Sequence, residues 1–223
     1  MELLRGKQLP RRILLYVFGY FVIAVGVVLA VNADLGVMSQ QVLPLALSRA
    51  TGLSLGTWAF IMLASFTLIQ IPLLGRKFQW FQLTQVGFSL LFGFFIDFVV
   101  FLMGDFQLPT YFGRQVMLWV GMVLVAAGIT LYLQAQLIAM SPEGLINAIL
   151  QKMPKAQFHW VKIIMDSALV ALGVLVAFVF LGELVGFREG TVLSAFFIGR
   201  FMPYTDRVLI PLLKKMGFRL EEY

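Results

Sequence analysis

Five stretches of about 20 nearly uninterrupted apolar residues constrain this chain more than any other feature of its sequence. A stretch of this length is what an α-helix needs to cross the hydrocarbon core of a bilayer. Because the stretches are continuously apolar and do not alternate, they are predicted to be helices and not barrel strands. The predicted spans are about Ile13–Val31, Leu55–Leu74, Gln82–Met103, Val116–Leu133 and Val161–Leu181.

A sixth, less apolar span is predicted at about Thr191–Met202, which either ends there or continues past Pro203 toward Leu213. Only 13% of the residues are charged, about half the share in soluble domains. Six spans with short loops would use nearly all 223 residues, so no soluble domain is expected.

The basic residues gather at the ends of the apolar stretches, where they anchor and orient helices. The net charge of +6 is therefore not interpreted as a nucleic-acid surface. Because Lys and Arg favour the cytoplasmic side, six spans place both termini in the cytoplasm. The N-terminal segment 1–12 and the segment 204–223 are thus predicted to be basic and cytoplasmic, with the first span retained and not cleaved as a signal peptide.

Two further stretches, Asn32–Thr51 and Gln134–Met153, are too apolar for exposed loops and too short to cross a membrane. Each contains a signal for the start of a helix, which predicts short helices near 38–50 and 141–152. In the second stretch Ser141 is the expected N-cap, followed by Pro142 and Glu143. In the first, Ser39 is the expected cap, followed by Gln40 and Gln41. These short helices either enter the bilayer from opposite faces or lie flat at its surfaces.

The two stretches belong to an internal repeat. Residues 16–48 align without gaps on residues 118–150, at an offset of 102, with ten identities in 33 positions. The identities include Met38 with Met140, Gly19 with Gly121 and Gly26 with Gly128. In each repeat the two glycines are seven residues apart on one helix face, a spacing expected for close helix packing. The predicted fold is all-α, with about six spans in two three-span repeats, 13–103 and 111–203. Because three is odd, the second repeat should run in the opposite sense across the membrane, a plan typical of transporters.

Four motifs resemble those of the YitT/YczE-like bacterial membrane proteins: ADLGV (Ala33–Val37), GLSLGT (Gly52–Thr57), GFFID (Gly93–Asp97) and SPEGL (Ser141–Leu145). The resemblance covers nearly the whole chain and implies five or six spans in the bacterial cytoplasmic membrane, in a family largely without an assigned activity. Many members are similar in carrying a Pro-Trp-Asp-like segment after the first motif. Here Ser39, Gln40 and Gln41 stand in that place without a carboxylate, which leaves Glu143 as the counterpart acid in the second repeat.

Ionisable groups inside a membrane are costly and therefore mark candidate sites. Asp97 is either a coupling-ion or proton site or a carboxylate hydrated at the outer surface. Asp166 either pairs with Lys162, one turn earlier, or acts as a gate or proton relay. Glu143 either caps its helix or meets a cation or a proton. The candidate substrate-binding residues are those at the starts of the short helices, Ser39, Gln40, Gln41, Ser141 and Glu143.

The chain contains no cysteine and one histidine, His159, which excludes thiolate and multi-histidine metal sites within one chain. No nucleophile with a base and no phosphate-binding glycine loop is visible, so neither an enzyme nor a cofactor is expected. The leading hypothesis is a secondary transporter or permease for a small solute, working alone or as a homodimer. The alternative is a substrate-binding or regulatory membrane subunit that acts with partner proteins.

Overall fold

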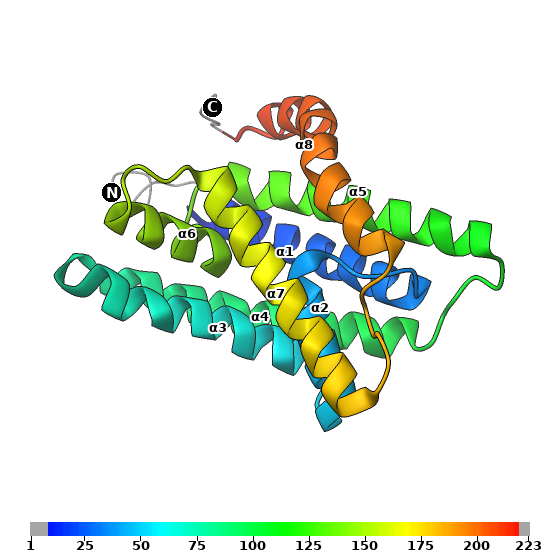
Figure 1. Ribbon diagram of the computed structural model, residues 1–223. Helices are drawn as coiled ribbons and strands as arrows, with labels where there is room; N and C mark the ends of the chain where they lie inside the picture. The colour runs from blue at the N-terminus through cyan, green and yellow to red at the C-terminus, as the bar shows by residue number, and fades with distance from the viewer. Residues whose placement is uncertain (1–8, 219–223) are drawn as a thin grey trace.

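The computed structural model describes residues 9–218, and all the regular elements in this range are helices (Figure 1). Five of them are long and apolar enough to cross a membrane: α1 (Leu9–Ala33), α3 (Leu55–Leu74), α4 (Thr84–Met103), α5 (Tyr111–Ala135) and α7 (Phe158–Leu181). The 3-10 turns η2 (Gly75–Lys77) and η3 (Trp80–Leu83) join α3 to α4. The first five predicted spans are confirmed as helices. The ends of the basic terminal segments, 1–8 and 219–223, lie outside the described residues.

The last helix, α8 (Glu189–Lys215), follows the second of the two predicted alternatives, because it continues past Pro203 toward Leu213 and does not end near Met202. It runs through Pro203, where the second repeat was predicted to end, and Figure 1 shows it bending along its length. A proline inside a helix removes one hydrogen bond and bends the helix without necessarily ending it. Because α8 carries Arg200, Asp206 and Arg207, it is not among the five helices of residues 9–218 with the length and composition of a span.

The two predicted short helices are present as α2 (Ser39–Thr51) and α6 (Ser141–Lys152). The predicted caps are wrong by one residue. The carbonyl of Met140 accepts the first helical bond of α6, from the N–H of Gly144 at 2.8 Å, and Met38 holds the equivalent place in α2. Ser141 is therefore the first residue inside α6, and its hydroxyl is free to bond to other helices.

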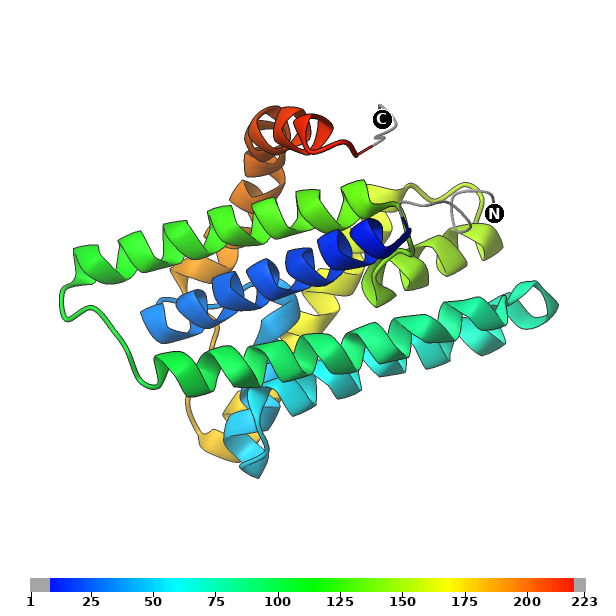
Figure 2. The same cartoon turned by 180° about the vertical axis from the view of Figure 1, so that it is seen from behind.

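The centre of the fold is the antiparallel pair α1 and α5, which lie side by side in Figure 2. The four glycines of the repeat form the contact. A Cβ atom on Gly26 would lie 2.6 Å from the carbonyl oxygen of Gly121, and one on Gly128 would lie 2.7 Å from that of Gly19. Gly26 lies opposite Gly121 and Gly19 lies opposite Gly128, so α1 and α5 run in opposite directions.

Two arginines at equivalent positions bind the ends of this pair. Arg12, which is 4% exposed, donates to the carbonyl of Ala135 at 3.2 Å and to the side-chain oxygen of Gln136 at 2.8 Å. Arg114, 102 positions later, pairs with Asp34 at 3.6 Å. Asp34 and Gln136 are equivalent residues after the ends of α1 and α5, and both have positive φ, at 52° and 53°. Each arginine thus stabilises the C-terminal end of the opposite helix.

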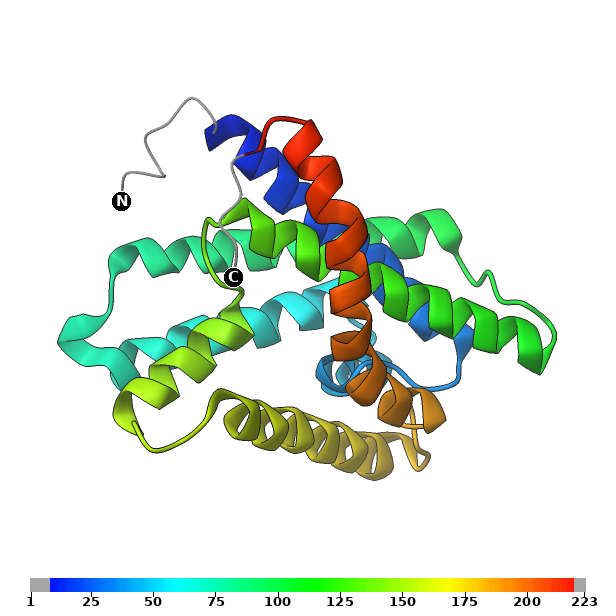
Figure 3. The ribbon, with the colours of Figure 1, turned by 90° about the horizontal axis from the view of Figure 1, so that it is seen from above.

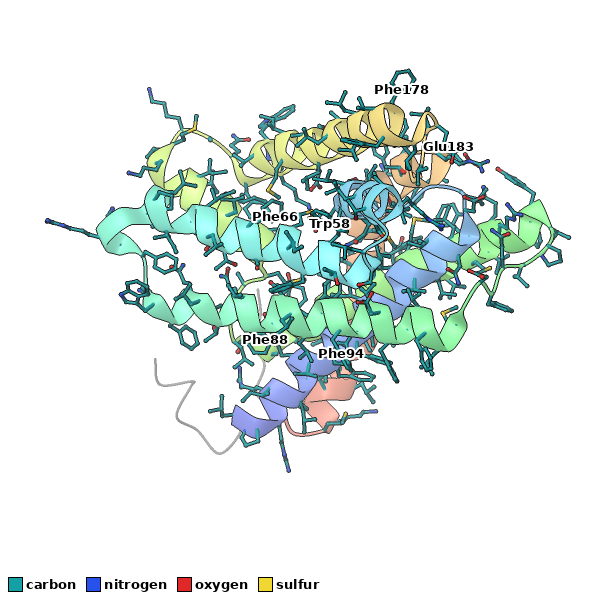
Figure 4. All side chains as sticks on the ribbon, turned by 90° about the horizontal axis from the view of Figure 1, so that it is seen from below. Trp58, Phe66, Phe88, Phe94, Phe178 and Glu183 are labelled. Atoms are coloured by element: carbon teal, nitrogen blue, oxygen red, sulfur yellow. The ribbon has the colours of Figure 1, made fainter. Side chains whose placement is uncertain are left out.

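The longer outer helices pack within their own half of the chain, whereas the short helices pack on the other half. Helix α4 packs on α1 while α8 packs on α5, and α2 packs on α7 while α6 packs on α3. The contact between α3 and α4 has no counterpart between α7 and α8. Helix α3 packs closely along α4, where Gly93 meets Gly56. Helices α7 and α8 diverge, and no atom lies within 4 Å of the position a Cβ on Gly199 would take (Figure 3). The outward side of α7 is apolar, and Phe178, 66% exposed, projects away from the other helices (Figure 4). Such an apolar surface is typical of a side that faces lipid or another protein.

We expect Gly26→Ala to lower the free energy of unfolding by about 1–3 kcal/mol, because the added methyl group would force α1 and α5 apart. Gly87→Ala is the matched control, since no atom lies within 4 Å of a Cβ at that position in α4 and alanine favours a helix. Thermal unfolding in detergent, followed by circular dichroism, compares the two. Equal stability of both variants would contradict the close contact.

Candidate functional site

The first turns of both short helices lie in the interior of the molecule. Helix α2 is pressed against α7, where a Cβ on Gly173 would lie 2.7 Å from the backbone nitrogen of Leu43. Helix α6 lies on α3 in the same way, and a Cβ on Gly144 would lie 3.0 Å from the amide group of Gln70. Figure 1 shows α7 crossing in front of α2. The first turns of the short helices are therefore enclosed by protein, whereas their last turns reach its surface.

A buried polar network surrounds the start of α6. The hydroxyl of Ser141 lies 3.0 Å from those of Thr67 and Ser89, and the amide of Gln70 donates to the Ser141 carbonyl at 3.3 Å. The side-chain oxygen of Gln85 accepts from Gln70 at 3.1 Å and from Thr67 at 3.2 Å. All five residues are at most 3% exposed. These bonds occupy the Ser141 hydroxyl, which explains why it does not cap its own helix.

A charged pair lies beside this network on α7. The ammonium of Lys162 and the carboxylate of Asp166 are 3.0 Å apart and one turn apart along the helix, as predicted for an ion pair. The amide nitrogen of Gln40, at the start of α2, makes a long contact of 3.5 Å with the other oxygen of Asp166. The structure thus brings together Gln40 and Asp166, two candidate residues far apart in the sequence.

Glu143 lies between the two groups, in the first turn of α6. Burial raises the pKa of the Glu143 carboxyl group above its ordinary value. Its own backbone N–H, the charge of Lys162 and the Tyr132 hydroxyl act against that shift, and the charge of Asp166 adds to it. Helix α6 lies outside the five candidate spans.

Aromatic side chains close the site on the side of α1 and α5. The rings of Tyr16 and Tyr20 meet that of Tyr132 edge-on, with centroids 5.9 and 6.0 Å apart. The hydroxyls of Tyr16 and Tyr20 are 2.9 Å apart, and Tyr16 also donates to the carbonyl of Ile138 at 3.1 Å. This cluster gives Glu143 a largely apolar wall with a few fixed hydroxyl groups.

Unsatisfied acceptors distinguish this region from the rest of the molecule. Among the described residues, five buried side-chain atoms have no hydrogen-bond partner, and four of them are acceptors. Three of the acceptors belong to the starts of the short helices or to the wall of α6: Gln41 Oε1, Gln70 Oε1 and Glu143 Oε2. Buried polar atoms are normally paired, so a site with spare acceptors is suited to a ligand that donates hydrogen bonds or carries positive charge.

Asp97 lies apart from the other candidate residues. Its carboxylate accepts from the backbone N–H of Gly56 at 2.8 Å and the hydroxyl of Ser54 at 2.6 Å, at the start of α3. It is eight positions, or about 12 Å along α4, from Ser89 in the polar network. These are the bonds of a group that stabilises a helix N-terminus. Ser39, the remaining candidate, is half-buried at the start of α2.

Sequence reasoning missed the residues that the longer helices contribute, above all Thr67, Gln70, Gln85, Ser89 and Tyr132. A signal for the first four was present. Thr67 and Gln70 are three positions apart on α3, and Gln85 and Ser89 are four positions apart on α4, so each pair forms a polar stripe on one face of an apolar helix. Which stripes would meet each other depended on the packing of the helices.

A cavity of about 540 Å³ lies beside α2. Its wall includes Leu45, one turn along α2 from Gln41, together with four charged residues: Asp34, Arg49, Glu183 and Arg188. Arg188 donates to the Asp34 carbonyl at 2.8 Å and so ties the loop after α1 to the loop before α8. The cavity brings a polar surface to within one turn of the start of α2.

Comparison with known proteins finds few matches. Residues 10–207 match the model of a family described as a family of unknown function (DUF6198). The chain is 28% identical over 211 residues to a protein of Bacillus subtilis (strain 168) named "Uncharacterized membrane protein YczE", covering 93% of this chain and 91% of that protein. No solved structure matches.

We expect Asp97→Ala to lower the free energy of unfolding by roughly 1–2 kcal/mol, because the start of α3 loses its charged acceptor. Thermal unfolding in detergent would measure the loss. Asp105→Ala, at an acid in the loop after α4, is the control and should change stability little. Unchanged stability of Asp97→Ala would contradict the capping role and return Asp97 to the set of candidate ion sites.

Proposed function

The chain belongs to the DUF6198 family of membrane proteins, and from this premise we propose that it is a secondary transporter for a small solute in the bacterial cytoplasmic membrane. The observation that carries the proposal is the polar site at the first turns of α2 and α6, which is fully buried around Ser141 and half-buried at Gln40 and Asp166. Polar and charged groups are costly in such a place and are typical of transport pathways.

The proposed architecture is a pair of inverted repeats, α1 to α4 and α5 to α8, with α8 as the sixth span. Three features support it. The helices of the two halves follow the same order, α1 and α5 are antiparallel, and the equivalent residues Arg12 and Arg114 make equivalent bonds at opposite ends of that pair. In transporters of this plan the substrate lies near the midplane, between the repeats and beside interrupted helices.

We propose that α2 and α6 are re-entrant. The start of α2 contacts Asp166, and its next turn contacts Gly173, so α2 lies at the depth of the middle of α7. Val42 and Ala46 on α2 are fully buried. A helix lying flat at the interface would instead expose one face to headgroups and water.

Unequal packing in the two halves supports alternating access. The hairpin of α3 and α4 is closed, its counterpart of α7 and α8 is open, and the cavity beside α2 reaches one turn short of Gln41. If the repeats exchange conformations, the second hairpin closes while the first one opens, and the site becomes accessible from the opposite side.

Single-cysteine labelling tests the orientation, and the chain has no native cysteine to remove. We expect Ser39→Cys and Gln41→Cys to react with a membrane-impermeant thiol reagent only from outside intact cells. Ser141→Cys and Glu143→Cys should react only in inverted vesicles. Reaction of both pairs from the same side would exclude inverted repeats, and rapid reaction of all four would exclude re-entrant helices and favour a regulatory or solute-binding subunit acting with partners.

A pair of cross-links tests whether the two hairpins exchange their closed and open conformations. Phe60 and Gly93 are in contact in the closed hairpin. Counted from the starts of α7 and α8, Ile163 stands at the position of Phe60 in α3, and Gly199 stands within one residue of the position of Gly93 in α4. We expect cysteines at the first pair to form a disulfide readily and cysteines at the second pair to form one only in the opposite state. A protein carrying all four cysteines should form one disulfide or the other. Simultaneous formation of both, or no Ile163–Gly199 disulfide under any condition, would contradict the exchange.

A further inference from the structure

The titratable groups around Glu143 come from three helices, and only those of α7 are charged. Helix α7 contributes Lys162 and Asp166, while α5 and α1 contribute the tyrosines of the aromatic wall. The other two neighbours add no charge here: α3 has no charged residue, and the only one in α4 is Asp97, at its far end.

The usual ligand of a half-helix N-terminus is an anion, because unpaired N–H groups and the helix dipole favour negative charge. In α6 the protein supplies that anion itself. The Glu143 carboxylate is in the first turn and accepts a bond from its own N–H. A second anion, from a solute, would be repelled by Glu143 and by Asp166. The start of α6 is therefore not suited to an anionic substrate.

The charges in this site do not balance. Two carboxylates, Glu143 and Asp166, face one ammonium, and Lys162 is already engaged with Asp166 at 3.0 Å. One oxygen of Glu143 has no donor. Gln70 Oε1, on a residue that is 0% exposed, also has no donor and lies 3.0 Å from the position a Cβ of Gly144 would take, so it points at the first turn of α6. A buried carboxylate without a full set of partners binds a proton or a cation.

We propose that Glu143 is the site at which the protein takes up one positive charge, as a proton or as a monovalent alkali or ammonium ion. The Tyr132 hydroxyl stabilises the charged carboxylate, and Gln70 Oε1 is a second unpaired acceptor that faces the same turn of α6. Uptake of that charge neutralises Glu143, which removes the cost of a buried anion. Asp166 and Lys162 are then left as a balanced pair of opposite charges. A role of this uptake in coupling rests on the proposed transport function, whereas the binding of the charge at Glu143 does not.

The first repeat provides a natural contrast. Gln41 stands 102 positions before Glu143, at the equivalent place in α2, and its amide carries no charge. Gln41 Oε1 is buried and lacks a donor, like its counterpart. The positive charge is therefore taken up in one half of the pseudo-symmetric site only, which gives the two halves different roles.

Infrared difference spectroscopy of the purified full-length protein in nanodiscs tests the proposal. We expect a carbonyl band of a protonated carboxyl group that persists above the pH at which an ordinary glutamate ionises. Glu143→Gln should lack this band, and Asp97→Asn, the matched control, should retain it. Titration with sodium, potassium or ammonium chloride at fixed ionic strength, compared with choline chloride, distinguishes the two forms of the charge. If the site binds only a proton, none of these salts changes the carbonyl band. If it binds a cation, one of the salts displaces the proton and the band disappears.

Thermal stability of the same samples gives an independent readout. Because the folded state penalises the ionised form of Glu143, stability should fall as pH rises through the raised pKa, and Glu143→Gln should remove that part of the fall. The proposal is overturned if Glu143 ionises like an exposed glutamate and no cation changes its spectrum. That result would leave solute flux and the cysteine pattern untouched, so it is distinguishable from a failure of the transport proposal.

Discussion

The backbone contact between α1 and α5 supports the rest of this structure. Two helices can approach this closely only where side chains are absent, and four glycines at matching positions, with Gly26 opposite Gly121 and Gly19 opposite Gly128, provide that contact. Packing of this kind is effective in lipid, where no hydrophobic force drives helices together. The arginines at both ends of the pair then fix its register.

The pair of α1 and α5 determines where the polar site lies. Each long central helix ends in a residue of positive φ, Asp34 or Gln136, and the chain turns there into a short helix. The short helices are held by the opposite repeat, α2 by α7 and α6 by α3. The result is a polar interior made from both halves, in which Ser141 bonds to Thr67 and Ser89 and Gln40 reaches Asp166.

The two halves are related in sequence but differ in chemistry and packing. The pair Gln41 and Glu143 is neutral on one side and acidic on the other, and the hairpin α3–α4 is closed while α7–α8 is open. The proposed transport function depends on this difference, because a carrier that moves between two states of similar energy and binds one ion at one place needs related halves with unequal charge.

The apolar stretches alone determined five of the helices and their bounds to within a few residues, because the bilayer requires internally bonded backbone of a given length. The short helices and the close packing of the glycines were also predictable, because both features recur in the two copies of the repeat. Tertiary structure decided what lies around Glu143, that Asp97 stabilises the start of α3, and that α8 continues beyond Pro203. These depend on which helices face each other, and side-chain contacts between distant segments leave no periodic signal in a single sequence.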